Sequence, residues 1–244
     1  MRRTLFVISI LFVLITQFSC VKKAALPQPP ANTAPPVTQP PVITEKTYLA
    51  LGDSYTVGSG VPPDDCYPIQ TKNWLKDKGI AGMKAPQIIA ASGWTTANLQ
   101  AAIATENPTG PFGVVSILIG VNDQFRGVDT AVYRIRFTQL LEKCISLTGN
   151  LPSHVVVLSI PDYSVTPFGR NFDVDRVSKE IDEFNAINKE ISISFNVQYL
   201  DITPLTREMK NDPGLVSFDG LHPSGLEYEK WAEKLAPLVK AILE

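Results

Sequence analysis

From residue 47 onward, short apolar runs alternate with longer stretches in which apolar residues recur every three or four positions. Apolar runs of this length, without alternating polar positions, are typical of strands that are covered on both faces. They predict strands at residues 48–51, 87–91, 114–119, 155–160 and 197–200. Strands that alternate with helices favour βαβ units, so the pattern predicts an α/β domain with a five-stranded parallel sheet.

Two stretches show the clearest helical periodicity, with apolar residues at the spacing that forms one face of an amphipathic helix. The first stretch carries Val177, Ile181, Phe184, Ile187 and Ile191. The second stretch, at the C-terminus, carries Leu226, Trp231, Leu235, Leu238 and Ile242. Ser224 and Glu227 have the spacing of a capping box, so we expect the C-terminal helix to begin at Ser224.

The first 19 residues have the pattern of an export signal. Arg2 and Arg3 precede an apolar segment, residues 5–15, that is too short to span a membrane. The pair Ser19–Cys20 resembles the lipobox of bacterial lipoproteins, although Gln17 and Phe18 depart from it. This resemblance implies that residues 1–19 are removed and that Cys20 carries the lipid. We therefore expect an exported protein of the cell envelope, anchored to a membrane; an uncleaved or differently cleaved signal is the alternative.

Residues 20–46 have the composition of a spacer. Seven prolines lie between residues 26 and 41, separated mainly by Gln, Thr, Asn and Ala. Such a tract cannot bury a core and favours extended polyproline conformations. The sequence therefore predicts a lipidated Cys20 followed by a Pro-rich linker over residues 20–46, and one globular domain over residues 47–244.

Charge and cysteine content exclude several classes of function. The chain has 22 basic and 24 acidic residues and no basic stripe, which argues against a nucleic-acid partner. Two histidines, no CxxC and no HExxH leave too few ligands for a zinc site, so we expect no metal and no cofactor. Cys144 falls on an apolar helical stripe, which favours a buried thiol, and a disulfide with Cys66 is the alternative.

Polar residues follow the predicted strands at the edge where parallel sheets bind ligands. They are Gly52-Asp53-Ser54, Ser92-Gly93-Trp94 and Gly120-Val121-Asn122-Asp123, joined near the C-terminus by Asp219-Gly220-Leu221-His222. A serine nucleophile needs a neighbouring base, the base needs an orienting acceptor, and the oxyanion needs fixed donors. His222 is the candidate base because the second histidine, His154, begins an apolar strand. Asp219 lies three residues before His222 and is the candidate for the orienting acceptor.

These four segments resemble, in order and spacing, blocks I, II, III and V of the SGNH hydrolases, also called GDSL esterases and lipases. The resemblance covers residues 47–244 and implies a three-layer α/β/α sandwich of flavodoxin-like order. It implies Ser54 as nucleophile and first oxyanion-hole donor, with Asp219 and His222 completing the triad. It implies a backbone donor at Gly93, the only residue that matches block II, and a side-chain donor at Asn122.

Other residues of these segments have simpler interpretations. Asp53 and Asp123 each sit beside a site residue, and we expect them to hold loops by accepting backbone amides. Trp94, Tyr163 and Phe168 are candidates for the rim of the pocket.

The sequence thus predicts a serine ester hydrolase that works through an acyl-enzyme on short-chain or acetyl esters. A small ester or an acylated polysaccharide is the expected substrate, because no segment offers an extended apolar groove under a lid. The alternatives are a lysophospholipase or thioesterase, and a non-catalytic envelope lipoprotein that binds glycan or protein.

Overall fold

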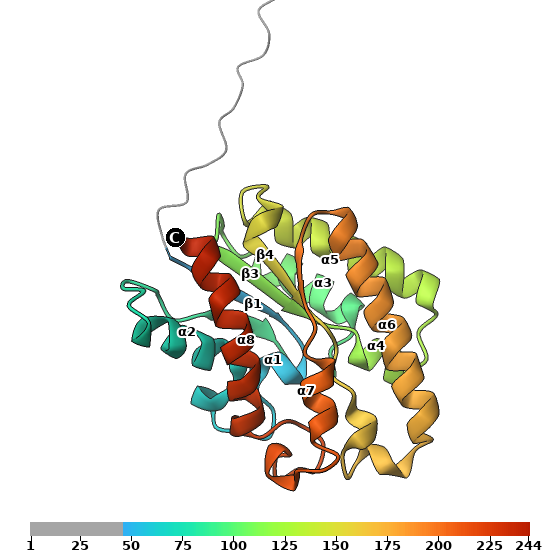
Figure 1. Ribbon diagram of the computed structural model, residues 1–244. Helices are drawn as coiled ribbons and strands as arrows, with labels where there is room; N and C mark the ends of the chain where they lie inside the picture. Colours follow the sequence, from blue (N-terminus) through green and yellow to red (C-terminus); the bar gives the residue numbers. More distant parts are fainter. Residues whose placement is uncertain (1–45) are drawn as a thin grey trace, which may run out of the picture. The chain divides into compact units, whose positions relative to one another are not determined.

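A computed structural model describes residues 46–244 (Figure 1). The predicted signal peptide, Cys20 and all but the last residue of the predicted linker lie outside the described residues. None of the helices within residues 46–244 is both long and apolar enough to cross a membrane.

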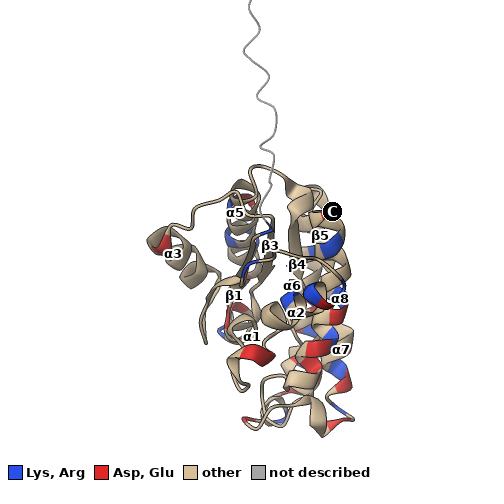
Figure 2. Ribbon diagram, turned by 90° about the vertical axis from the view of Figure 1, so that its left-hand side faces the viewer, with Lys and Arg blue, Asp and Glu red and all other residues tan. Residues whose placement is uncertain are grey.

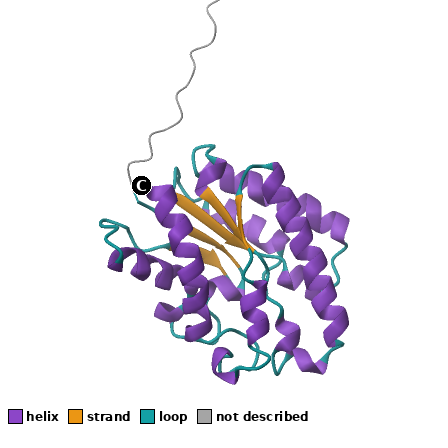
Figure 3. Ribbon diagram, in the orientation of Figure 1, coloured by secondary structure: helices purple, strands orange, loops and turns teal. Residues whose placement is uncertain are grey.

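A parallel sheet forms the centre of the domain (Figure 3). It has five strands in the order β2-β1-β3-β4-β5. The strands are β1 Tyr48–Gly52, β2 Gln87–Ala90, β3 Val114–Leu118, β4 Val155–Leu158 and β5 Gln198–Leu200. Strands β1, β3 and β4 are buried along their whole length. The chain leaves β1 for β2 in one direction and returns past β1 to β3, which creates the switch point where ligands bind in such sheets.

Helices cover both faces of the sheet, which confirms the three-layer α/β/α architecture (Figure 2). On one face α2 (Tyr67–Asp77) packs against α8 (Gly225–Leu243). On the other face α5 (Thr130–Leu147) packs against α3 (Thr96–Glu106) and α6 (Val174–Ser194). A short helix follows each of the strands β1, β3 and β5 within a few residues. These helices are α1 (Ser54–Val57), α4 (Val121–Phe125) and α7 (Thr203–Glu208), respectively.

Strands β2 and β5 differ from the expectation of strands covered on both faces. They are the two edges of the sheet, and apart from the buried Ile89 their residues are only partly buried or, at Gln87, exposed. Strands β3 and β4 also end earlier than the apolar runs do. The carbonyl of Ile119 accepts a hydrogen bond from Tyr133 Oη, and the amide of Ile160 donates to Asn185 Oδ1, so both residues bond to helices instead of strands.

The two helices expected from periodicity correspond to α6 and α8. Ser224 caps α8 by accepting the amide of Glu227, but the reciprocal half of the capping box is not formed. The Glu227 carboxylate accepts instead from the indole of Trp231, at 2.8 Å, because both side chains are buried. Leu226, placed on the apolar face by its sequence, is exposed.

Both described cysteines, Cys66 and Cys144, are buried as free thiols, so the disulfide alternative is wrong. Burial raises the pKa of the Cys144 thiol to about 12. His154, which the sequence excluded as a base, lies away from the site, with Nδ1 2.7 Å from the Gly113 carbonyl.

Candidate active site

The segment after β1 turns sharply into α1. A Cβ on Gly52 would lie 2.1 Å from Thr56 Oγ1 and 2.4 Å from the Leu118 carbonyl, so only glycine fits there. Asp53 caps α1 by accepting the amide of Tyr55 at 3.0 Å, as expected. Ser54, the first residue of α1, is nearly buried, with 6% of its surface exposed.

Asp53 is itself fully buried, and its second carboxylate oxygen, Oδ2, has no hydrogen-bond partner in the described part of the chain. Burial is the main cause that raises its pKa to about 8, and the nearby Asp123 acts in the same direction. A neutral carboxyl at this position is therefore favoured through much of the acidic and neutral pH range.

The segment that carries His222 is a tight loop in which the amide of Ser217 donates to the His222 carbonyl. His222 Nδ1 lies 2.7 Å from Asp219 Oδ2. The other carboxylate oxygen, Oδ1, accepts the Ser217 hydroxyl and the amides of Leu221 and His222, each at 2.9 Å. The imidazole also packs on the Tyr55 ring, with centroids 5.0 Å apart.

These contacts determine the charge of Asp219. Partial burial acts to raise its pKa, but the hydrogen bonds from His222, Leu221 and Ser217 outweigh burial and lower the pKa to about 2. An ionised carboxylate can only accept, so the bond to His222 requires the proton on Nδ1. The opposite nitrogen, Nε2, is then free to accept a proton.

Ser54, Asn122 and His222 line one small cavity of about 100 Å³. The remaining wall is largely apolar or aromatic and consists of Tyr55, Val121, Phe125, Tyr163, Phe168 and Leu221. No hydrogen bond joins the Ser54 hydroxyl to the imidazole within residues 46–244. In hydrolases this contact is often long before substrate binds and shortens in the complex.

The two further oxyanion-hole candidates lie in adjoining segments. Asn122 Nδ2 donates to the Trp94 carbonyl at 3.0 Å, which ties the start of α4 to the loop after β2. Gly93 has a φ of 80° and its carbonyl accepts from Arg126, but Gly93 is not among the residues that line the cavity. Asp123 reinforces this junction by accepting the amide and the hydroxyl of Thr96, at 2.8 and 2.6 Å.

Of the three rim candidates, Tyr163 and Phe168 line the cavity. Trp94 does not; its side chain packs against the core. Phe125 is a wall residue that the sequence interpretation missed. It lies three residues after Asn122 on the same short helix, and that spacing places the two side chains near one face.

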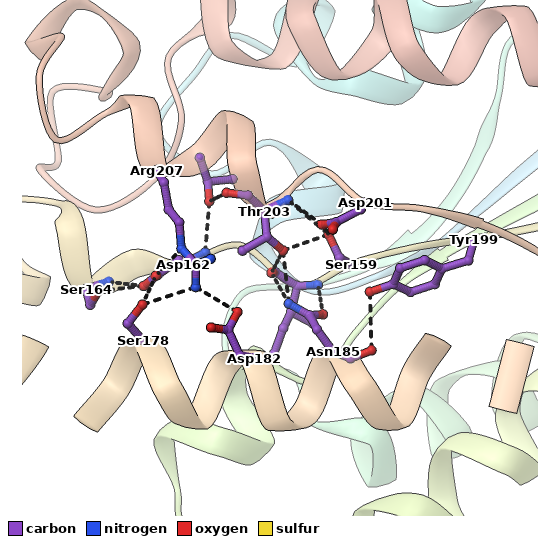
Figure 4. A network of polar contacts seen from close by, with 12 residues as sticks. Ser159, Asp162, Ser164, Ser178, Asp182, Asn185, Tyr199, Asp201, Thr203 and Arg207 are labelled. Carbon is purple, nitrogen blue, oxygen red and sulfur yellow. Dashed lines mark hydrogen bonds and ion pairs between the residues drawn. The ribbon is translucent and has the colours of Figure 1, made fainter. Parts of the chain in front are cut away.

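The loop after β4 is held by a buried network around Asp162 (Figure 4). Asp162 accepts the amide and hydroxyl of Ser164, the hydroxyl of Ser178 on α6 and the guanidinium of Arg207 on α7. Burial acts to raise the pKa of Asp162, but these bonds lower it, so the carboxylate stays charged. The network fixes the adjacent Tyr163, and the amide of Phe168 bonds the Gly220 carbonyl in the His222 loop.

The profile of the GDSL-like lipase/acylhydrolase family matches residues 50–230. The chain belongs to this family and is an ester hydrolase of the GDSL/SGNH type. No curated protein matches the sequence.

Solved structures share the fold. TesA matches with a TM-score of 0.62 at 18% identity, over 81% of this chain and 99% of that one. The psychrotrophic esterase EstA from Pseudoalteromonas sp. matches with a TM-score of 0.59 at 20% identity, over 82% and 99%. The acetyl xylan esterase AlAXEase matches with a TM-score of 0.60 at 18% identity, over 78% and 97%.

Proposed function

We propose that this protein hydrolyses short-chain carboxylic esters, acetyl esters foremost, through an acyl-enzyme at Ser54. The observation that carries the proposal is the single cavity that Ser54, Asn122 and His222 line, with Asp219 bonded behind the imidazole. No other arrangement of a hydroxyl, an imidazole and a carboxylate occurs among the described residues, because the second histidine, His154, lies elsewhere.

In the first half-reaction, His222 Nε2 takes the proton of the Ser54 hydroxyl while Oγ attacks the ester carbonyl. Asp219 stabilises the imidazolium that forms, through the 2.7 Å bond to Nδ1. The imidazolium then gives its proton to the departing alcohol, and the acyl group stays on Ser54. In the second half-reaction, His222 deprotonates water, which attacks the acyl-enzyme. The imidazolium then returns this proton to Ser54 Oγ as the bond to the acyl group breaks, which releases the carboxylic acid and restores Ser54 and His222.

The oxyanion of each tetrahedral intermediate needs donors that are fixed before the reaction. We assign this role to the Ser54 amide, the Gly93 amide and Asn122 Nδ2. Asn122 carries two N–H groups, and one bond to the Trp94 carbonyl leaves the other for the oxyanion.

The size of the cavity supports a small acyl group. Its volume of about 100 Å³ is well below the 300–1,000 Å³ or so of pockets that enclose drug-sized ligands. Phe125, Tyr163 and Phe168 form an aromatic wall, and a longer chain would need these rings to move. One of the proteins that shares the fold is an acetyl xylan esterase, which is consistent with an acetyl group on a carbohydrate. Hydrolysis of lysophospholipids or of long-chain acyl thioesters requires a longer acyl site and is less well supported.

The N-terminal pattern completes the proposal. With residues 1–19 removed, Cys20 lipidated and residues 20–46 as a spacer, the hydrolase would act at the cell envelope on small esters or acylated polysaccharide. Replacing Cys20 with Ser should release the protein from the membrane fraction of the cell that produces it. Continued tight association would show an anchor other than the lipid.

A fluorophosphonate probe and p-nitrophenyl acetate test the catalytic proposal together. The native protein should be labelled and should cleave the ester, and Ser54→Ala should lose both properties while keeping its melting temperature. Ser146→Ala is the control, because Ser146 is an exposed serine of α5 that lies outside the cavity, and this variant should stay labelled. An unlabelled, inactive native protein would support the non-catalytic binding alternative.

A further inference from the structure

A second and larger cavity lies beside the catalytic one. Its volume is about 520 Å³, and it lies between α4, the 127–130 segment and the first half of α6. Phe125 and Tyr163 line both cavities, so the two spaces are neighbours that share an aromatic partition. We call the larger space the side cavity.

One wall of the side cavity is aromatic. Phe172 lies edge-on to Phe125 and to Tyr163, with centroids 5.7 and 6.4 Å apart. Phe125 is 50% exposed and Phe172 is 38% exposed, although both belong to the same ring cluster. Exposed, well-packed aromatic rings offer a flat apolar surface to a ligand.

A second part of the lining carries polar side chains, mainly from α6, where Val177 and Phe184 also contribute apolar surface. Arg176 Nη1 donates to Glu180 at 2.7 Å, and Gln124 Nε2 donates to the same carboxylate, also at 2.7 Å. Glu183 follows on the next part of the helix, with its side chain 55% exposed. The same cavity therefore presents carboxylate acceptors and guanidinium donors as well as the aromatic rings.

The combination of aromatic and charged side chains in the side cavity favours a sugar ring over a fatty acyl chain. A fatty acyl chain would take the carboxylates and the guanidinium out of water without replacing their hydrogen bonds, which costs free energy for each group. A polyhydroxylated ring can place its apolar face on Phe125 or Phe172 and its hydroxyls against Arg176, Glu180 and Glu183. The walls are also fixed relative to each other, because Asp162, next to Tyr163, accepts from Ser178 on α6.

We infer that the side cavity binds the alcohol half of the substrate and that this alcohol is a sugar unit. The inference rests on the proposed function, since the acyl group must occupy the catalytic cavity at the same time. The aromatic partition then separates the two halves of the ester, with the short acyl group beside Ser54 and the sugar ring beside Phe172. The established class of reaction is unchanged, and the side cavity adds the selection of the alcohol.

Two substrates with the same acyl group test the inference, because they differ only in the alcohol. An acetylated xylo-oligosaccharide and p-nitrophenyl acetate would be compared for the native protein, Phe172→Ala and Glu183→Leu. Ile193→Ala and Glu233→Leu serve as matched controls, because both residues are exposed and lie outside the side cavity. Melting temperatures identify any variant that fails to fold, and Glu183, at 55% exposure, is a position where folding should persist.

We expect the ratio of kcat/KM for the acetylated sugar to kcat/KM for p-nitrophenyl acetate to fall at least tenfold in Phe172→Ala and in Glu183→Leu. The controls should keep the native ratio. An unchanged ratio in both side-cavity variants would overturn the inference, as would a native protein that cleaves p-nitrophenyl acetate but not the sugar. A parallel assay would use p-nitrophenyl octanoate. A side-cavity variant that changes the preference between the acetate and octanoate esters, while the ratio for the acetylated sugar stays unchanged, would assign the side cavity to the acyl chain instead. Loss of both activities in the native protein would refute the proposed function itself.

Discussion

Asp219→Asn separates the chemical role of Asp219 from its structural role. In the native protein, Oδ1 holds three donors of the loop, and Oδ2 alone faces His222 Nδ1. Asparagine keeps an oxygen for the three loop donors and turns an NH₂ group toward the imidazole. His222 must then accept at Nδ1, which puts its proton on Nε2 and removes its capacity to deprotonate Ser54.

The magnitude follows from the geometry of the pair. A carboxylate 2.7 Å from an imidazolium is worth about 6 kcal/mol at an effective dielectric constant of 20. Partial exposure of Asp219 reduces this figure, so we take about 4–5 kcal/mol of lost transition-state stabilisation. That corresponds to a fall in kcat of about 10³-fold to 10⁴-fold at 25 °C.

The assay measures kcat on p-nitrophenyl acetate together with the melting temperature. Asp219→Asn should lose only about 1–2 kcal/mol of stability, because the three loop bonds are kept and the charge-assisted bond with His222 is replaced by a neutral one from the amide to Nδ1. Asp219→Ala should be equally inactive and clearly less stable, because the loop loses all four bonds. A kcat for Asp219→Asn within tenfold of the native value would refute the assignment of Asp219 as the orienting acid.

Three further outcomes are expected. Asn122→Ala should lower kcat about 100-fold to 1,000-fold with little change in KM, since the amide is asked to hold charge that exists only in the transition state; a change confined to KM would make Asn122 a substrate-binding residue. The folded-state pKa of Asp53, about 8, lies above its unfolded value of 3.8, so the folded chain holds the extra proton and stability should fall as pH rises between them. In urea titrations, the free energy of unfolding of Asp53→Asn should rise relative to that of the native protein through that range, by up to about 1.4 kcal/mol per pH unit. A difference between the two proteins that does not change with pH would contradict a protonated Asp53. Arg207→Ala should lower the free energy of unfolding by about 2–3 kcal/mol, because it leaves the buried Asp162 carboxylate without its cation, and a loss below 0.5 kcal/mol would show that the two serines suffice.

Several features of this protein follow from the sequence because they depend on local pattern. Apolar runs predicted all five strands, and the reason holds for β1, β3 and β4, which are buried along their whole length, but not for β2 and β5, which are the edges of the sheet. The glycine before Asp53 and the polar residues after β1 and β3 marked one edge of the sheet, because the carboxyl ends of parallel strands must meet there. The resemblance of four segments to one family was enough to predict the class of hydrolase, which the family match confirms.

Other features depended on contacts between segments far apart in the chain, and only the tertiary structure decided them. Which strands become edges follows from the order of the sheet, and Glu227 turns from its capping role because Trp231 is buried against it. The Asp162 network joins the loop after β4 to α6 and α7, and the residues involved have no regular spacing in the sequence, so no local pattern predicts the network. The aromatic partition of Phe125 and Tyr163, which separates the two cavities, likewise forms only when α4 and the loop after β4 pack together, since neither segment encloses a space by itself.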